Sequence, residues 1–234
     1  HAVKLQTYTA DTMTLDVDQP EFKIEGGPWH GFGLYELYEW AHTPFGWHEE
    51  LFQLAKEVGI TVFSTPFDDT ALDLLESLKS PAYKIASFEL VDLPLISNVA
   101  STQKPIILST GMATEEEVGN AIEAARVAGS GEIILLHCIS SYPTPIAEAN
   151  LKMIDHLAKS FGTPVGLSDH TMGVTASVAA VALGACVVEK HFTLSRFDKG
   201  PDSEFSIEPS ELKELCESVN AVWRALGNSR FERP

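Results

Sequence analysis

Two histidines follow consecutive strand-like runs, and their spacing predicts a shared role. His170 lies in GLSDHTMG, residues 166–173, and His191 lies in VVEKHF, residues 187–192. The interval is about one strand–helix–strand unit, so both imidazoles are expected at the same end of a parallel sheet. Two imidazoles leave positions open for water and a substrate oxygen, which suits a divalent metal that polarises a carbonyl. Taken singly, each histidine is also consistent with a structural hydrogen-bonding role.

A second group of candidates surrounds the lysine of KIASFE, residues 84–89. Lys84 lies in an otherwise apolar run, and burial of its amine requires an anion or a carboxylate beside it. A structural pair with a glutamate is the alternative. Hydroxyl groups at the ends of this and neighbouring runs suit a phosphate cradle; they belong to Ser87, Ser109, Ser140 and Ser168. Asp169 either orients a neighbouring group or is an exposed loop carboxylate.

These groups together predict a metal-assisted reaction of a carbonyl with a phosphorylated or anionic partner. The sequence contains no HxH pair, GxSxG turn, P-loop or GxGxxG fingerprint, which disfavours amidohydrolases, α/β-hydrolases and nucleotide-binding folds. A Schiff-base aldolase would have to use Lys84 as its amine. The two histidines would then have no role in the chemistry.

The elements that must position these residues alternate regularly along the chain. The predicted strands are residues 2–7, 61–64, 82–87, 105–109, 132–138, 164–168 and 186–192. The predicted helices are residues 48–58, 70–78, 93–100, 114–128, 151–161, 175–183 and 209–226. Thr114 and Glu117 form a capping box, Pro209 suits a first helical turn, and Gly129 and Gly184 stand where helices end.

Apolar strands that alternate with helices predict an α/β fold with a parallel sheet covered on both faces. Seven units fit a doubly wound sheet, and they also fit a TIM (β/α)8-type barrel that lacks its first strand. Reactive side chains follow nearly every predicted strand. A barrel brings the ends of all its strands to one mouth, where catalytic groups gather. A doubly wound sheet places only the strand ends near its switch point at the ligand site. We therefore favour the barrel.

One connection is unusually long and aromatic. Roughly forty residues separate the first strand from the first predicted helix, far more than a usual βα loop. They include Trp29, Tyr35, Tyr38, Trp40 and Trp47. Long loops at the catalytic end of such folds commonly cover or line a site, and a purely packing role is the alternative.

Composition excludes several classes of partner. The 234 residues carry a formal net charge of −17, so no basic surface is available for nucleic acid or an anionic membrane. A hydrophobic content of 44% is sufficient for a full core. No run approaches a membrane span and no signal-peptide pattern opens the chain, so we expect a cytoplasmic protein. We expect buried free thiols, typical of a reducing compartment, at Cys138, Cys186 and Cys216.

Eight ordered motifs resemble the sialic acid synthase family over essentially the whole chain. They are VKLQTYT (3–9), FSTPFD (63–68), YKIASFE (83–89), KPIILSTGM (104–112), LLHCISSYPTP (135–145), GLSDHT (166–171), EKHFTL (189–194) and GPDSEFS (200–206). Within the family, LYELYEWAHTPFGWH (34–48) and DSEFSIEP (202–209) look most like pseudaminic acid synthases. The resemblance implies condensation of phosphoenolpyruvate with an open-chain diacetamido-trideoxy hexose related to altrose. The product would be a nine-carbon keto acid such as pseudaminic acid, with phosphate released by C–O cleavage.

The resemblance also implies a cofactor and roles for individual residues. A divalent metal, Mn²⁺ or Mg²⁺, would be held by His170 and His191 and would polarise the sugar aldehyde. Glu89 matches a carboxylate beside the reacting centre that is suited to proton transfer, so the predicted catalytic set is Glu89, His170, His191 and Asp202. Positions matching the phosphate pocket are Lys84, Ser87, Ser109, Ser168 and Ser140, the last standing where sialic acid synthases have an asparagine. Positions matching contacts with the sugar or the intermediate are Lys4, Gln6, Thr65, Tyr142 and Asp202.

Two parts of the family pattern have no counterpart in residues 1–234. They are the first barrel strand, with its glutamate and Asn-His motif, and the C-terminal antifreeze-like domain. We therefore expect one barrel domain over 1–234, small-molecule substrates and a homodimer in the full-length protein. Two alternatives stay open. One is an N-acetylneuraminate or legionaminate synthase acting on another hexosamine, and the other is a non-catalytic truncated barrel that serves in binding or assembly.

Overall fold

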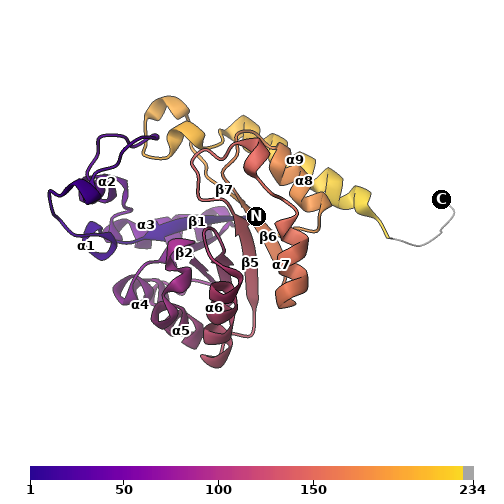
Figure 1. The fold of residues 1–234 in the computed structure, drawn as a ribbon, viewed down its shortest axis with the longest axis horizontal. Helices are drawn as coiled ribbons and strands as arrows, with labels where there is room; N and C mark the ends of the chain where they lie inside the picture. Colours follow the sequence, from indigo (N-terminus) through magenta and orange to yellow (C-terminus); the bar gives the residue numbers. More distant parts are fainter. Residues whose placement is uncertain (229–234) are drawn as a thin grey trace. The chain divides into compact units, whose positions relative to one another are not determined.

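The structure is a computed structural model that describes residues 1–228, and its internal contacts divide it into two compact units. The first unit is His1–Leu135 and the second begins at Leu136. The described residues contain seven strands, ordered β1 to β7 as in the sequence (Figure 1). Strand pairs β1–β2, β2–β3, β3–β4 and β6–β7 are all parallel. The parallel α/β fold predicted from the sequence is therefore confirmed.

The first unit contains four complete strands and the beginning of a fifth. The strands are β1 (Ala2–Thr7), β2 (Thr61–Pro66), β3 (Tyr83–Ile85), β4 (Ile106–Ser109) and β5 (Ile133–Cys138), which continues into the second unit. The helices are α1 (Ala10–Met13), α2 (Leu34–Ala41), α3 (His48–Val58), α4 (Asp69–Ser77), α5 (Leu93–Ser101) and α6 (Glu115–Val127). Helices α4, α5 and α6 lie side by side (Figure 1). The largest fully buried side chains here include Leu75, Tyr83, Ile85, Ile96, Ile106 and Leu108.

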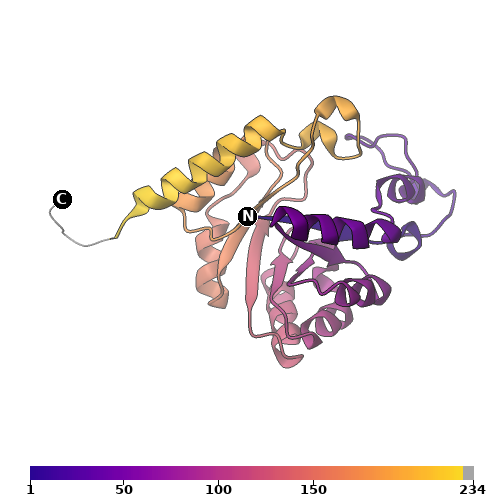
Figure 2. The ribbon, with the colours of Figure 1, turned by 180° about the vertical axis from the view of Figure 1, so that it is seen from behind.

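The second unit carries the last strands and helices. Its complete strands are β6 (Val165–Asp169) and β7 (Val188–Lys190), and its helices are α7 (Met153–Phe161), α8 (Thr175–Ala182) and α9 (Pro209–Leu226). Helix α9 lies along α8, as both views show (Figures 1 and 2). Leu136, Ile154 and Ile207 are fully buried in this unit, and each such side chain stabilises the fold by about 1.5–3 kcal/mol.

Several helix-end residues predicted from the sequence have the predicted roles in the structure. The Thr114 side chain accepts a hydrogen bond from the Glu117 amide, and the Glu117 carboxylate accepts one from the Thr114 amide. Pro209 occupies the first position of α9. Gly129 and Gly184, which follow α6 and α8, have φ angles of 112° and 101°, a conformation that favours glycine.

Gly166 allows a close approach of chain segments just before the candidate site. A Cβ atom at this position would lie 2.4 Å from the Val187 carbonyl oxygen and 2.7 Å from Leu136 Cδ2. Only a residue without a side chain fits there, so Gly166 brings β6 close to the segment that leads into β7.

Two expectations about individual segments are wrong. Helix α2 lies inside the aromatic connection, where no helix was predicted. Cys186 is exposed and Cys216 is half-buried, so only Cys138 is a buried thiol, although all three are free. Cys186 lies outside β7, which begins only at Val188, later than the predicted strand at 186–192. Among the described residues, none of the helices combines the length and hydropathy needed to span a bilayer.

Candidate active site

The two predicted imidazoles lie together in the second unit. His170 directly follows β6 and His191 directly follows β7, and their ring centres are 5.3 Å apart. Nδ1 of His170 donates to the Ile139 carbonyl oxygen, at 2.9 Å, because a carbonyl can only accept. Nδ1 of His191 lies 3.2 Å from a carboxylate oxygen of Asp202. Each ring is therefore held through Nδ1, which leaves Nε2 as the nitrogen that can bind a ligand.

This donor set fits an open metal site. An imidazole nitrogen lies about 2.1 Å from a bound divalent ion, so two rings that share an ion must lie only a few ångströms apart, as these do. Carbonyl and carboxylate partners on Nδ1 are typical of metal-binding histidines. Within residues 1–228, no group of three or more histidine, cysteine or acidic side chains could hold an ion. Water or substrate would have to supply the remaining ligands.

Aromatic rings surround the imidazole pair. The Tyr142 ring lies 4.3 Å from His170 and 6.1 Å from His191, measured between ring centres. Phe205 lies 5.2 Å from His191 and 5.3 Å from Tyr142. Because these contacts restrict ring rotation, the imidazoles are held in place by packing as well as by hydrogen bonds.

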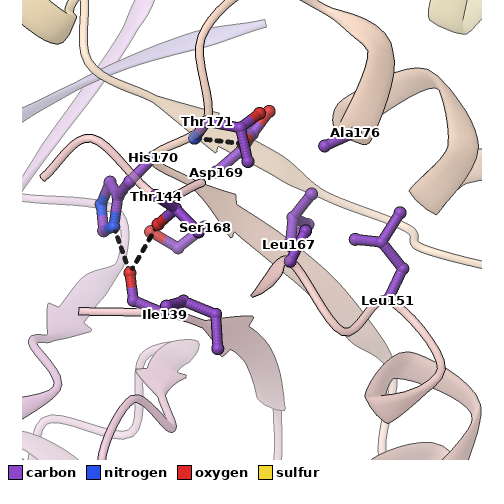
Figure 3. Close-up of a pocket in the computed structure, with 10 residues that line it drawn as sticks. Ile139, Thr144, Leu151, Leu167, Ser168, Asp169, His170, Thr171 and Ala176 are labelled. Carbon is purple, nitrogen blue, oxygen red and sulfur yellow. Dashed lines mark hydrogen bonds between the residues drawn. The ribbon is translucent and has the colours of Figure 1, made fainter. Parts of the chain in front are cut away.

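Figure 3 shows a small pocket beside His170, lined by residues of the second unit only. The His170 imidazole and the Thr144 hydroxyl both donate to the carbonyl oxygen of Ile139, the residue after β5, as the dashed lines in Figure 3 show. Asp169 is 2% exposed, so the interpretation of it as an exposed loop carboxylate is wrong. Its carboxylate accepts from the Thr171 amide and from the Lys190 amine.

Sequence reasoning missed one carboxylate on β7. Glu189 lies opposite Ser168 in the β6–β7 register, and the Ser168 hydroxyl donates to it at 2.9 Å. Because side chains alternate along an extended chain, Glu189 on β7 and His191 just after it are expected on the same side. That alternation in EKHF was the available signal. Ser168, predicted to bind phosphate, thus already donates its hydroxyl hydrogen to a carboxylate.

In the first unit, Lys84 and Glu89 influence each other electrostatically. Lys84 is 2% exposed, and one carboxylate oxygen of Glu89 is buried without a hydrogen-bond partner. Burial raises the pKa of Glu89 to about 7, although a hydrogen bond to its own backbone and the nearby Lys84 amine oppose the shift. A carboxyl group with this pKa can exchange a proton near neutral pH, as a proton-transfer group must.

Several predicted site hydroxyls are buried without partners. In the first unit they are Thr65 Oγ1 and Ser109 Oγ, and in the second unit Ser140 Oγ. An orphaned buried hydroxyl is costly unless a ligand or water satisfies it, so these positions are candidates for substrate contact. Gln6 pairs with Thr65 in the β1–β2 register, and Lys4 lies two residues earlier on the same face of β1. Ser87 is half-buried, and its hydroxyl does not cap the short helix that it precedes.

A buried chain of hydrogen-bonded polar side chains joins α3 to β1 and β2. His48, Thr7 and Ser64 are each 0% exposed. Nδ1 of His48 donates to the Pro44 carbonyl oxygen, so Nε2 accepts from the Thr7 hydroxyl at 2.8 Å. The Thr7 oxygen in turn accepts from Ser64 at 2.7 Å. Thr7 and Ser64 directly adjoin Gln6 and Thr65, so this chain supports two predicted substrate contacts.

We expect Thr7→Val to lower the free energy of unfolding by about 1–3 kcal/mol, because it leaves His48 Nε2 and the Ser64 hydroxyl buried without a partner. Thr7→Ser keeps the hydroxyl and should lose less than half as much. Urea unfolding of both variants measures the difference. A loss in Thr7→Ser as large as that in Thr7→Val would show that the methyl group contributes as much as the hydroxyl, and would contradict the prediction.

The aromatic connection contacts the end of β1 through α2. Tyr8, the residue after β1, packs edge-on against Tyr38 at 5.8 Å and Phe67 at 5.3 Å. Burial raises the pKa of Tyr38, and the Glu89 carboxylate adds to the shift, so α2 lies within electrostatic range of Glu89. Trp40 and Trp47 are exposed. That this segment covers or lines a site stays a prediction.

Comparison with known proteins decides the family. The model of the NeuB family matches residues 1–231. This chain belongs to the NeuB family. Its ordered motifs had indicated the same sialic acid synthase family.

Individual relatives match most of the chain. A pseudaminic acid synthase of Helicobacter pylori is 48% identical over 96% of this chain and 66% of its own length. An N,N'-diacetyllegionaminic acid synthase of Campylobacter jejuni is 46% identical over 77% of this chain and 55% of its own length. The chain thus spans about two thirds of the pseudaminic acid synthase that it matches.

A solved NeuB-family structure has the same fold. The crystal structure of the N-acetylneuraminic acid synthetase from Leptospira borgpetersenii, in complex with citrate, matches with a TM-score of 0.88 and 31% identity. The match covers 100% of this chain and 76% of that one.

Proposed function

We propose that this NeuB-family protein condenses phosphoenolpyruvate with an open-chain acetamido sugar of the diacetamido-trideoxy altrose type. The product is a nine-carbon keto acid such as pseudaminic acid, and phosphate leaves by C–O cleavage. Relatives that are 44–48% identical over nearly the whole chain are pseudaminic acid synthases, which supports this sugar. The observation that carries the proposal is the pair of imidazoles 5.3 Å apart, each held through Nδ1.

His170 and His191 would hold a divalent ion, Mn²⁺ or Mg²⁺, through their Nε2 atoms. When bound, such an ion supplies Lewis-acid polarisation of the sugar aldehyde. Ile139 and Asp202 fix the orientation of the two rings through Nδ1, and the Tyr142 ring contributes an apolar wall to the sugar site. Asp202 is 38% exposed at its side chain, so it remains open to contact with the sugar.

The first unit supplies groups for phosphoenolpyruvate. Lys84 and the unpartnered Ser109 hydroxyl offer a cation and a donor for phosphate oxygens, with Ser87 in support. In the second unit, Ser140 has an unpartnered hydroxyl and Ser168 retains acceptor capacity. Lys4, Gln6 and Thr65 contribute contacts to the sugar or the intermediate.

Glu89 is the proposed base. Carbon C3 of phosphoenolpyruvate attacks the aldehyde carbon, which makes C2 electron-poor, and water then adds at C2. The Glu89 carboxylate accepts the proton that this water loses, for which a pKa of about 7 is well placed. The C2 hydroxyl of the resulting tetrahedral centre loses its proton and becomes the keto oxygen as the C–O bond to phosphate breaks, and the bonding electrons leave with the phosphate oxygen. The aldehyde oxygen takes up one proton as it becomes a hydroxyl, so the two protons of the added water end on this hydroxyl and on the released phosphate.

A phosphate-release assay with a panel of sugars tests the proposal. The protein is incubated with phosphoenolpyruvate, Mn²⁺ and one of three sugars: the diacetamido-trideoxy altrose, the legionaminate precursor or N-acetylmannosamine. We expect release with the first at a kcat/KM at least tenfold above the others. Preference for the second sugar would favour a legionaminate synthase, which the 46% identity to such an enzyme keeps open. No release with any sugar would favour a non-catalytic role.

We propose that the parallel strands belong to a TIM barrel, as the similarity to the Leptospira synthetase supports. We also propose that the protein acts as a homodimer. The three free cysteines support a cytoplasmic location.

A further inference from the structure

A buried ion pair connects the two residues that immediately precede the paired histidines. Asp169 on β6 and Lys190 on β7 are direct partners in the parallel register. His170 follows the first and His191 follows the second. The spacing between the two imidazoles therefore depends on this one point of strand pairing.

The pair is almost completely removed from solvent. The side chains of Lys190 and Asp169 are 4% and 1% exposed, and the amine lies 3.0 Å from a carboxylate oxygen. Ser177 on α8 donates to the same oxygen at 2.5 Å. Because each buried charge is costly without the other, a one-residue slip of β7 along β6 would leave both unpaired.

The same two side chains hold the backbone beyond His170. The Lys190 amine donates to the Thr171 carbonyl oxygen at 2.6 Å, and the Thr171 amide donates to the second oxygen of Asp169 at 2.8 Å. The latter contact is visible in Figure 3. His170 is thus held by its own ring hydrogen bond and by the fixed residues on either side of it.

We infer that the Asp169–Lys190 pair is a register lock that sets the separation of His170 and His191, which makes Lys190 and Asp169 positioning residues for the metal ion. The inference rests on the proposed function for the identity of the ion. The lock itself belongs to the metal-free protein, since every contact that forms it is between side chains and backbone of this chain.

The lock is tested by measuring the affinity of the Lys190→Met variant for Mn²⁺ with electron paramagnetic resonance. We expect the dissociation constant to rise 10–100-fold, the range found when a group that orients a metal ligand is removed. Lys104→Met is the matched control, because it breaks a partly buried lysine–glutamate pair with Glu76 in the first unit. The control should bind Mn²⁺ like the wild type.

Two further variants cover the case in which Lys190→Met fails to fold. Ser177→Ala removes one donor to Asp169 and should raise the dissociation constant by about threefold to tenfold. The double variant Asp169→Asn, Lys190→Met leaves no unpaired charge and should still bind Mn²⁺ at least tenfold more weakly. Wild-type affinity in the folded double variant would overturn the inference.

A measurement without metal separates this inference from the proposed function. In the metal-free protein, hydrogen exchange at the Thr171 amide should accelerate at least tenfold in Lys190→Met or in the double variant, and remain unchanged in Lys104→Met. Unchanged exchange in a folded lock variant would overturn the lock. The wild type could fail to bind Mn²⁺ while the lock variants still showed faster exchange at the Thr171 amide. The metal assignment would then fail and the lock would stand.

Discussion

Replacing His170 or His191 with alanine is expected to lower metal-dependent phosphate release on the order of 10³-fold, the scale of losing a group that stabilises developing charge. Within residues 1–228, no group of three or more histidine, cysteine or acidic side chains could hold an ion, so losing one ring should leave too few protein ligands for the metal. Phosphate release in the presence of Mn²⁺ measures the loss. His156→Ala, an exposed position on α7 in the same unit, should behave like the wild type.

The Nδ1 partners of the two histidines differ, so only one of them can be tested by mutation. Asp202→Asn keeps an oxygen near His191 Nδ1 but removes the negative charge, so we expect a smaller loss, about 10–100-fold in Mn²⁺ affinity. No comparable variant exists for His170, because its Nδ1 partner is the Ile139 backbone. Turnover that survives in either alanine variant at wild-type rate would contradict the proposed metal site.

The fold was predictable from the sequence wherever local signals agreed. Strand β1 and helices α3 and α9 have the predicted bounds, because periodicity and helix-end residues point to the same limits. Helix α2 was missed because its aromatic residues suggested a lining loop, and aromatic side chains are poor indicators of a helix. The helix is stabilised instead by contacts such as Tyr8–Tyr38, which link distant parts of the chain.

The candidate site was predictable in its residue types but only partly in its contacts. Strand alternation and the strand–helix–strand interval were sufficient to pair His170 with His191. They could not show that Asp169 and Lys190 are buried against each other, since that depends on the β6–β7 register. The hydrogen-bond chain from His48 to Ser64 joins residues on separate elements, so no local pattern in the sequence reveals it.

Glu89→Gln is expected to lower kcat by about 10²–10⁴-fold, because the amide cannot accept a proton from the attacking water. The wild-type kcat/KM should rise with pH and level off above about 7, since the base must be ionised and burial raises the pKa of Glu89 to about 7. The variant should lack this limb. Glu116→Gln, at an exposed position in the first turn of α6, is the matched control and should keep it.

The raised pKa of Glu89 also predicts how the free energy of unfolding changes with pH. Glu89 has a pKa above the ordinary value of 4.5, so the folded state binds its proton more tightly than the unfolded state does. Its contribution to stability is therefore fully present below about pH 4.5 and is lost as the pH rises through about 7. Urea unfolding should show this decline in the wild type and a weaker one in Glu89→Gln. An identical decline in both would show that Glu89 is not the buried acid, and its role as the base would then fail with it.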